Sequence, residues 1–79
     1  MDSFYFTFKE TSFHHGFYAE VIATNLVEAK EGIETAYPGQ WQGGETAEEA
    51  SDWLPKQELQ KLVALHKPEG EWKIKRAGW

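Results

Sequence analysis

The sequence predicts a small α+β domain, a two-layer sandwich with two or three helices on one face of a three-stranded antiparallel sheet. Three observations carry this prediction. Apolar residues alternate with others near the start of the chain. Near the middle, the sequence carries signals for both the beginning and the end of one helix, and apolar alternation returns near the C-terminus. A chain of 79 residues builds one small core, so we expect a single domain over residues 1–79 with the order β-β-α-α-β.

The first two strands are expected at Phe4–Lys9 and Phe17–Thr24, where apolar residues alternate with others. The residues expected to pack together across this antiparallel hairpin are Phe4, Phe6, Phe8, Phe17, Ala19, Val21 and Ala23. Tyr18 and Ile22 fall on the opposite face. That face is therefore not wholly polar, which indicates that something covers it.

A helix is expected at about Leu26–Tyr37, with one apolar face. Asn25 can cap its start and Glu28, three residues later, can complete a capping box. Pro38 ends the helix, because the residue before a proline avoids the α region. Gly32 costs about 1 kcal/mol against alanine inside a helix. A close approach of the helix to the sheet at Gly32 would explain its presence.

The centre of the chain is expected to be irregular, with a very short edge strand at Gln40–Gln42 and a break at Gly43–Gly44. Thr46 and Glu49 repeat the capping-box spacing and predict a short acidic helix over Ala47–Leu54.

The last third is expected to form a helix over Pro55–Lys67 and a strand over Glu71–Arg76. The apolar face expected for this helix comprises Leu59, Leu62, Val63 and His66. The final strand is expected to pair beside the first, with Lys73 and Lys75 toward solvent, as edge strands often have.

The charge is unevenly distributed along the chain, whose net charge is −5. Residues 20–52 contain eight acids and one base, a balance of −7, whereas residues 53–79 contain six bases and three acids, a balance of +3. An acidic soluble protein with solvated faces fits this pattern, and so does an acidic face meant for a protein partner with a basic surface. General nucleic-acid binding is disfavoured, because phosphate contacts need clustered Lys and Arg.

Composition and motifs point away from catalysis. The chain has no cysteine, no phosphate loop and no nucleophile motif, so we expect no enzyme activity and no cofactor. His14, His15 and His66 lack metal-ligand spacing, and we expect no metal site. No run of about 20 apolar residues could cross a membrane. With no signal peptide recognised, a cytoplasmic chain is expected.

Trp41 stands between two glutamines in a glycine-rich stretch and is the first candidate for an apolar anchor, because tryptophan is enriched in interface hot spots. The candidate partner-binding residues are Glu28, Glu31, Glu34, Trp41, Glu45, Glu48, Glu49 and Asp52.

The segment Tyr18–Gly39 runs from a strand through A-x-N-x-x-E-A-K to Y-P-G. It resembles small proteins of phages, prophages and plasmids, and the strand-to-helix unit of some small anti-CRISPR proteins. The resemblance covers about a quarter of the chain and carries over no functional residue. It implies an inhibitor that binds a host or defence complex stoichiometrically and occupies a basic surface that otherwise holds nucleic acid.

Two other functions fit the sequence. A small nucleic-acid-binding or regulatory module would use the basic last strand, with Lys73, Lys75 and Arg76 beside Trp72 and Trp79. A structural protein that homodimerises through an edge strand fits the composition equally well.

Overall fold

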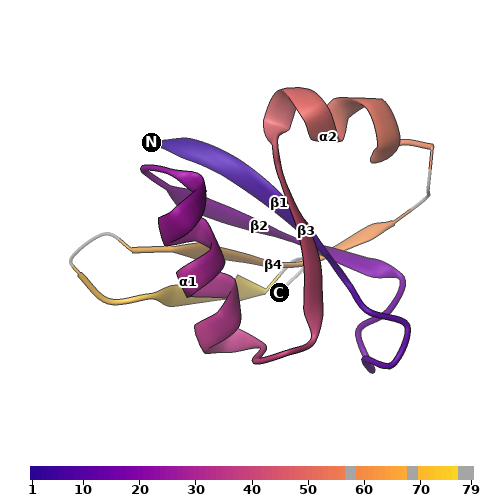
Figure 1. The fold of residues 1–79 in the computed structure, drawn as a ribbon, viewed down its shortest axis with the longest axis horizontal. Coiled ribbons are helices and arrows are strands. Elements are labelled where there is room, and N and C mark those ends of the chain that lie inside the picture. Colours follow the sequence, from indigo (N-terminus) through magenta and orange to yellow (C-terminus); the bar gives the residue numbers. More distant parts are fainter. Residues whose placement is uncertain (57–58, 68–69, 77–79) are drawn as a thin grey trace.

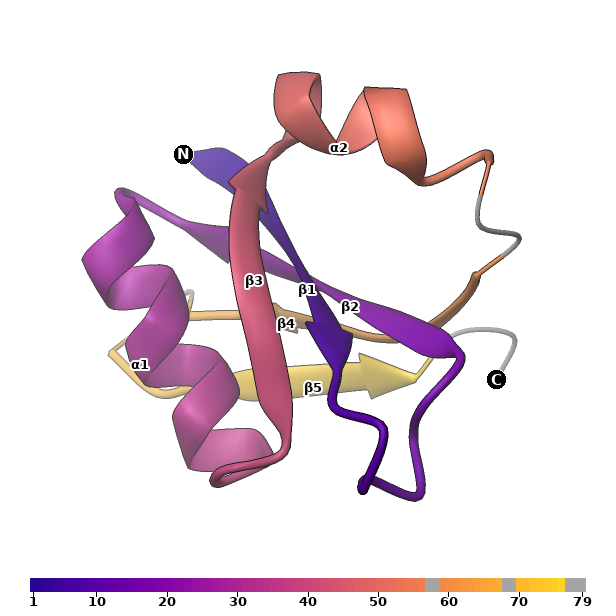
Figure 2. The ribbon, with the colours of Figure 1, turned by 45° about the vertical axis from the view of Figure 1, so that its right-hand side comes forward.

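The computed structural model describes residues 1–56, 59–67 and 70–76. These residues form a five-stranded mixed sheet with two helices (Figure 1). The strands are β1 (Asp2–Phe8), β2 (Phe17–Ala23), β3 (Trp41–Thr46), β4 (Gln60–His66) and β5 (Lys73–Arg76), and the helices are α1 (Leu26–Ala36) and α2 (Ala47–Trp53). The strand order is β3-β1-β2-β4-β5, visible in Figure 2, with β2 and β4 parallel and the other pairs antiparallel. The predicted α+β class is confirmed.

The core lies between α1 and one face of the sheet. Each of the first two strands buries alternate residues, as the period-two pattern predicted. The core residues are Phe4, Phe6, Phe8, Ala19, Val21, Ala23, Ala29, Ile33, Val63 and Leu65. Phe17 is only partly buried and packs at the margin of this core. The predicted hairpin is confirmed, and β1 and β2 pair with Phe4 opposite Val21 and Phe6 opposite Ala19.

Both predicted helix starts are present. The amide of Glu28 donates to Asn25 Oδ1 over 2.9 Å, so Asn25 caps α1. The Glu28 side chain accepts a hydrogen bond from the Thr24 amide, one residue earlier than the capping box requires. At α2, Thr46 and Glu49 form the complete capping box that their spacing predicted.

The predicted third helix is wrong: within Pro55–Lys67, the described residues form a turn at 54–56 and strand β4. Residues 57–58 of that range lie outside the described part of the chain. Val63 and Leu65 are buried in the core, Ala64 between them is only partly buried, and Leu62 packs at the margin of the core. A short apolar run fits both a helix and a buried strand, and here the free edge of β2 supplied pairing for a strand.

Gly43 and Gly44 do not end regular structure as expected, but lie inside β3. Both have positive φ, 85° and 121°, where glycine carries little steric cost. The register of β3 against β1 shifts at this point, with Tyr5 opposite Glu45 and Phe6 opposite Gly43. The glycines therefore form a bulge, and the short edge strand expected at Gln40–Gln42 extends to Thr46.

The predicted three-stranded antiparallel sheet is also wrong, because β5 pairs with β4 and does not lie beside β1. The neighbours of β1 are β2 and β3. Parallel pairing of β2 with β4 needs a long crossover, and α1, β3 and α2 supply it. The last strand is nevertheless at an edge, and Lys73 and Lys75 are exposed as predicted.

Candidate protein-binding surface

The turn after α1 is held by a carboxylate. Glu34, which is exposed, accepts hydrogen bonds from the Gly39 amide and from Trp41 Nε1, each over 2.9 Å. These donors, the Gly39 amide first and the Trp41 indole second, lower the pKa of Glu34 below its usual value. Glu34 therefore stays ionised at neutral pH and is fixed in position by uncharged donors, while the charge of Lys9 adds a smaller electrostatic effect that also lowers its pKa.

Trp41 opens β3 and is half-buried. Its ring meets Phe6 edge-on with 5.3 Å between ring centroids, so it packs against the core. The rest of the ring is open at the sheet edge, where β3 has no further strand beside it. Its part as a partner anchor stays a prediction.

The acidic residues around α2 are also fixed by neutral donors. Glu49 Oε1 accepts from the Thr46 amide over 3.0 Å and from the Thr46 hydroxyl over 3.1 Å. Glu45 accepts from Trp53 Nε1. Glu48 and Asp52 are exposed on the same short helix, and no hydrogen bond or ion pair of their carboxylates appears within the described residues.

The remaining two predicted acids lie on α1. Glu28 accepts the Thr24 amide over 3.2 Å. Glu31 is exposed and faces Lys67 Nζ at 3.5 Å. Among the eight predicted residues, Glu31 is thus the one that forms an ion pair within the described part of the chain.

The two groups of acids, on α1 and around α2, lie on either side of β3 and apart from each other. Across the described elements α1 and α2 make no contact with each other, but both contact β3 (Figure 2). We call this two-part region the acidic surface. Its residues are those predicted from the sequence: Glu28, Glu31, Glu34, Trp41, Glu45, Glu48, Glu49 and Asp52.

Sequence reasoning missed a polar network on the other face of the sheet. Glu20 accepts hydrogen bonds from the Ser3 hydroxyl over 2.7 Å and from the Tyr5 hydroxyl over 3.4 Å, and it pairs with Lys61 Nζ at 2.5 Å. Burial raises the pKa of Glu20, but the bonds from Lys61 and Ser3 outweigh it and leave that pKa lowered. The bond to Glu20 raises the pKa of Lys61. The one signal in the sequence was the mixed character of the face that carries Tyr18 and Ile22.

A groove of about 280 Å³ adjoins this network at the corner between β1, β3 and the end of α2. It is lined by Tyr5, Thr7, Gln42, Gly43, Gly44, Glu45 and Trp53.

The histidines do not assemble a metal centre. His14 packs against the rings of Phe8 and Tyr37, at centroid distances of 5.3 and 5.0 Å, while His66 lies in β4. Within residues 1–56, 59–67 and 70–76, no group of three His, Asp or Glu side chains is placed to share an ion. Neither described helix combines the length and the apolar character that a membrane span requires.

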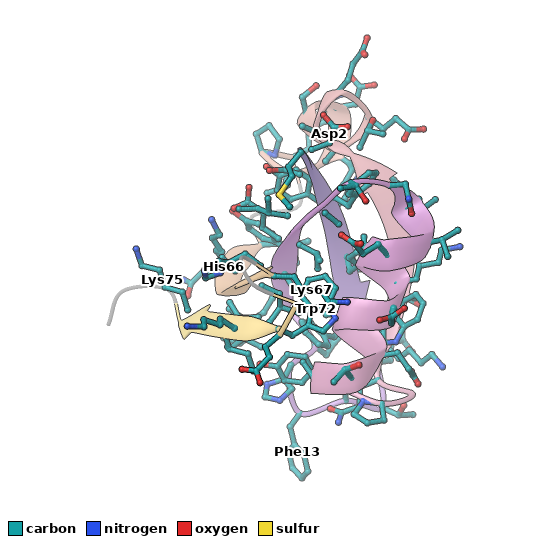
Figure 3. All side chains as sticks on the ribbon, turned by 90° about the vertical axis from the view of Figure 1, so that its left-hand side faces the viewer. Asp2, Phe13, His66, Lys67, Trp72 and Lys75 are labelled. Carbon is teal, nitrogen blue, oxygen red and sulfur yellow. The ribbon has the colours of Figure 1, made fainter. Side chains whose placement is uncertain are left out.

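Trp72, one of the two tryptophans named for the nucleic-acid alternative, does not lie with Lys75 (Figure 3). Trp72 packs on α1, whereas Lys75 points away from that helix (Figure 3). Trp79 lies outside the described residues. Comparison of the chain with protein-family models, curated proteins and solved structures finds no match.

Proposed function

We propose that this protein is a non-enzymatic protein-binding module whose acidic surface occupies the basic surface of a partner. The partner in this proposal is a machine that handles nucleic acid, inhibited in the manner of the small phage proteins that the segment Tyr18–Gly39 resembles. Binding is stoichiometric and needs no cofactor.

One observation carries the proposal: four carboxylates of the acidic surface are held by uncharged donors. Glu28, Glu34, Glu45 and Glu49 accept hydrogen bonds from backbone amides, a hydroxyl or indole N–H groups. Such bonds fix the direction of a carboxylate but leave its full negative charge uncompensated. A structural ion pair, by contrast, would cancel that charge.

Fixed charges favour binding for two reasons. Side chains already held in one rotamer lose little conformational entropy on association, which otherwise costs about 0.5–1.5 kcal/mol for each immobilised side chain. A field of one sign also speeds encounter with a basic partner and selects against acidic ones. Glu48 and Asp52, with no described ion-pair partner, remain available to meet Lys or Arg directly.

The test is capture of partners with tagged protein from the cells in which it occurs. Glu48→Lys with Asp52→Lys reverses two exposed acids of the acidic surface and leaves the Thr46–Glu49 capping box untouched. Glu10→Lys with Glu71→Lys makes the same change in net charge at exposed positions elsewhere. We expect the first pair to lose a basic partner that wild type and the second pair retain. Equal recovery by all three proteins would refute the proposal.

A further inference from the structure

The two faces of the sheet are covered unequally. α1 covers one face, and the opposite face is covered at its β1–β3 corner by α2 within the described residues (Figure 2). We call that opposite side the open face. By strand alternation and register it carries Ser3, Tyr5, Thr7, Tyr18, Glu20, Ile22, Glu45, Lys61, Ala64, His66, Lys73 and Lys75.

Register aligns one row of residues across all five strands of the open face. Glu45 lies opposite Tyr5, Tyr5 opposite Glu20, Glu20 opposite Ala64, and Ala64 opposite Lys75. Neighbouring strands are about 4.8 Å apart, so this row is about 19 Å long. The row runs from Glu45 on the edge strand β3 to Lys75 on the edge strand β5.

Cations dominate the β4–β5 side of the open face. Lys73 and Lys75 are exposed and have no described acidic partner, and His66 lies opposite Lys73. Figure 3 shows His66 and Lys75 on the side of the sheet away from α1. The acid at the centre of the face, Glu20, is already neutralised by Lys61. Two lysines are therefore left to meet an anion.

Aromatic rings occupy the middle and the opposite corner. Tyr5 and Tyr18 are half-buried neighbours with 6.0 Å between ring centroids. Beyond Tyr5, the groove of about 280 Å³ is lined by a second aromatic residue, Trp53, by the amide of Gln42 and the hydroxyl of Thr7, and by the Glu45 carboxylate, which accepts from Trp53 Nε1. Aromatic walls with a few hydrogen-bonding groups suit a flat heterocycle such as a nucleobase.

We propose that the open face binds single-stranded nucleic acid. In this arrangement Lys73 and Lys75 contact phosphates, the Tyr5–Tyr18 pair stacks bases, and the groove beside Trp53 receives one base. Sheets that bind RNA use the same physical combination, in which aromatic side chains on an uncovered face stack two or three bases. The site shares Glu45 with the acidic surface, because Glu45 lines the groove, but it does not depend on the proposed function.

Two alternative occupants fit the face less well. A second copy related by a two-fold axis beside β5 would bring Lys73 and Lys75 against the same lysines, which is repulsive. An acidic protein would satisfy the lysines but would make no use of the tyrosine pair and the aromatic groove together. The net charge of −5 counts against nucleic acid, and the acids of α2 adjoin the open face at its β1–β3 corner, so the proposed phosphate contacts are confined to the β4–β5 side.

The test is fluorescence anisotropy with a labelled single-stranded DNA of mixed sequence and about 12 nucleotides, a length typical of such sites. We expect saturable binding at low salt and weaker binding to the matching duplex. Tyr18→Leu should weaken binding at least about 5-fold, because each stacked base contributes about 1–3 kcal/mol. Lys73→Gln with Lys75→Gln should reduce the slope of log K against log salt by about 1.4, or 0.7 for each lost phosphate contact.

Lys9→Gln with Lys30→Gln removes the same charge from exposed positions off the open face and serves as the control. The control should bind as wild type does, and circular dichroism should show every variant folded. The proposal fails if wild type does not bind the strand, if the control loses as much affinity as the lysine pair, or if duplex binds equally well. Self-association that protects the open face would also overturn it, and analytical ultracentrifugation detects that outcome.

Discussion

Gly32 faces the indole ring of Trp72 so closely that a Cβ at residue 32 would lie 2.6 Å from two atoms of the ring. Gly32 is buried in the middle of α1, and Trp72 immediately precedes β5. Lys67 Nζ lies 5.5 Å from the centroid of the same ring. The missing side chain of Gly32 therefore allows the segment leading into β5 to pack on α1.

We predict that Gly32→Ala destabilises the fold although alanine is the better helix former. The helix would gain about 1 kcal/mol, but overpacking against a ring typically costs about 1–3 kcal/mol. Urea unfolding measures the difference. Val27→Ala, at an exposed position of α1, is the control and should have little effect. Trp72→Leu should make Gly32→Ala less harmful, and independent effects of the two substitutions would contradict the contact.

Ile33→Ala should cost about 2–5 kcal/mol of unfolding free energy, because Ile33 is fully buried under the sheet. This is a large fraction of the stability of a small domain. Chemical denaturation with an unchanged m-value would measure it. A loss below about 1 kcal/mol would place Ile33 outside the core.

The pH dependence of stability should reflect the Glu20–Lys61 pair. The pKa of Glu20 is lowered in the folded protein, so its contribution is present above its usual pKa of 4.5 and is lost as pH falls below that value. The pKa of Lys61 is raised, so its contribution is present below 10.5 and is lost as pH rises beyond that value. Glu20→Gln should flatten the acid limb of stability against pH in urea unfolding. A variant that retains the wild-type acid limb would show that Glu20 does not contribute.

Substitution by lysine should lower the stability of the fold at Glu49 but hardly change it at Glu48. Glu49→Lys removes half of the α2 capping box, and loss of a cap costs about 0.5–2 kcal/mol. Glu48→Lys changes an exposed neighbour with no described hydrogen bond and should shift stability by less than about 0.5 kcal/mol. Thermal unfolding compares the two variants. Equal melting temperatures would mean that the capping box does not stabilise the fold.

The sequence predicted those elements whose local signals agree with one another. The hairpin pattern around Phe4–Phe8, the Asn25 cap and the Thr46–Glu49 box each act within a few residues, and each was found. Strand β4 was missed because Leu59, Leu62, Val63 and His66 also satisfy helical spacing, and pairing with β2, about 40 residues away, decided the outcome. The break predicted at Gly43–Gly44 is a bulge in β3. A bulge depends on pairing with a partner strand, here β1, which the local sequence does not reveal.

The acids of the acidic surface can be named from the sequence, but their arrangement cannot, and their part in binding stays a prediction. The charge count of −7 over residues 20–52 treats all acids alike. The structure divides them into Glu20, which is neutralised by Lys61, and others such as Glu34, which uncharged donors hold in place. The open face was not predicted, because its rows depend on a register between strands far apart in the sequence.

The most direct test of the account is calorimetric titration of the captured basic partner with wild-type protein at low and high salt. Charges held on a surface should act within a Debye length, about 8 Å at physiological ionic strength. Wild-type affinity should therefore fall as salt rises, and Glu48→Lys with Asp52→Lys should lower it at least about 10-fold at low salt. Glu10→Lys with Glu71→Lys should bind as wild type does. Affinities that are equal for all three proteins and insensitive to salt would contradict the acidic surface as the binding site.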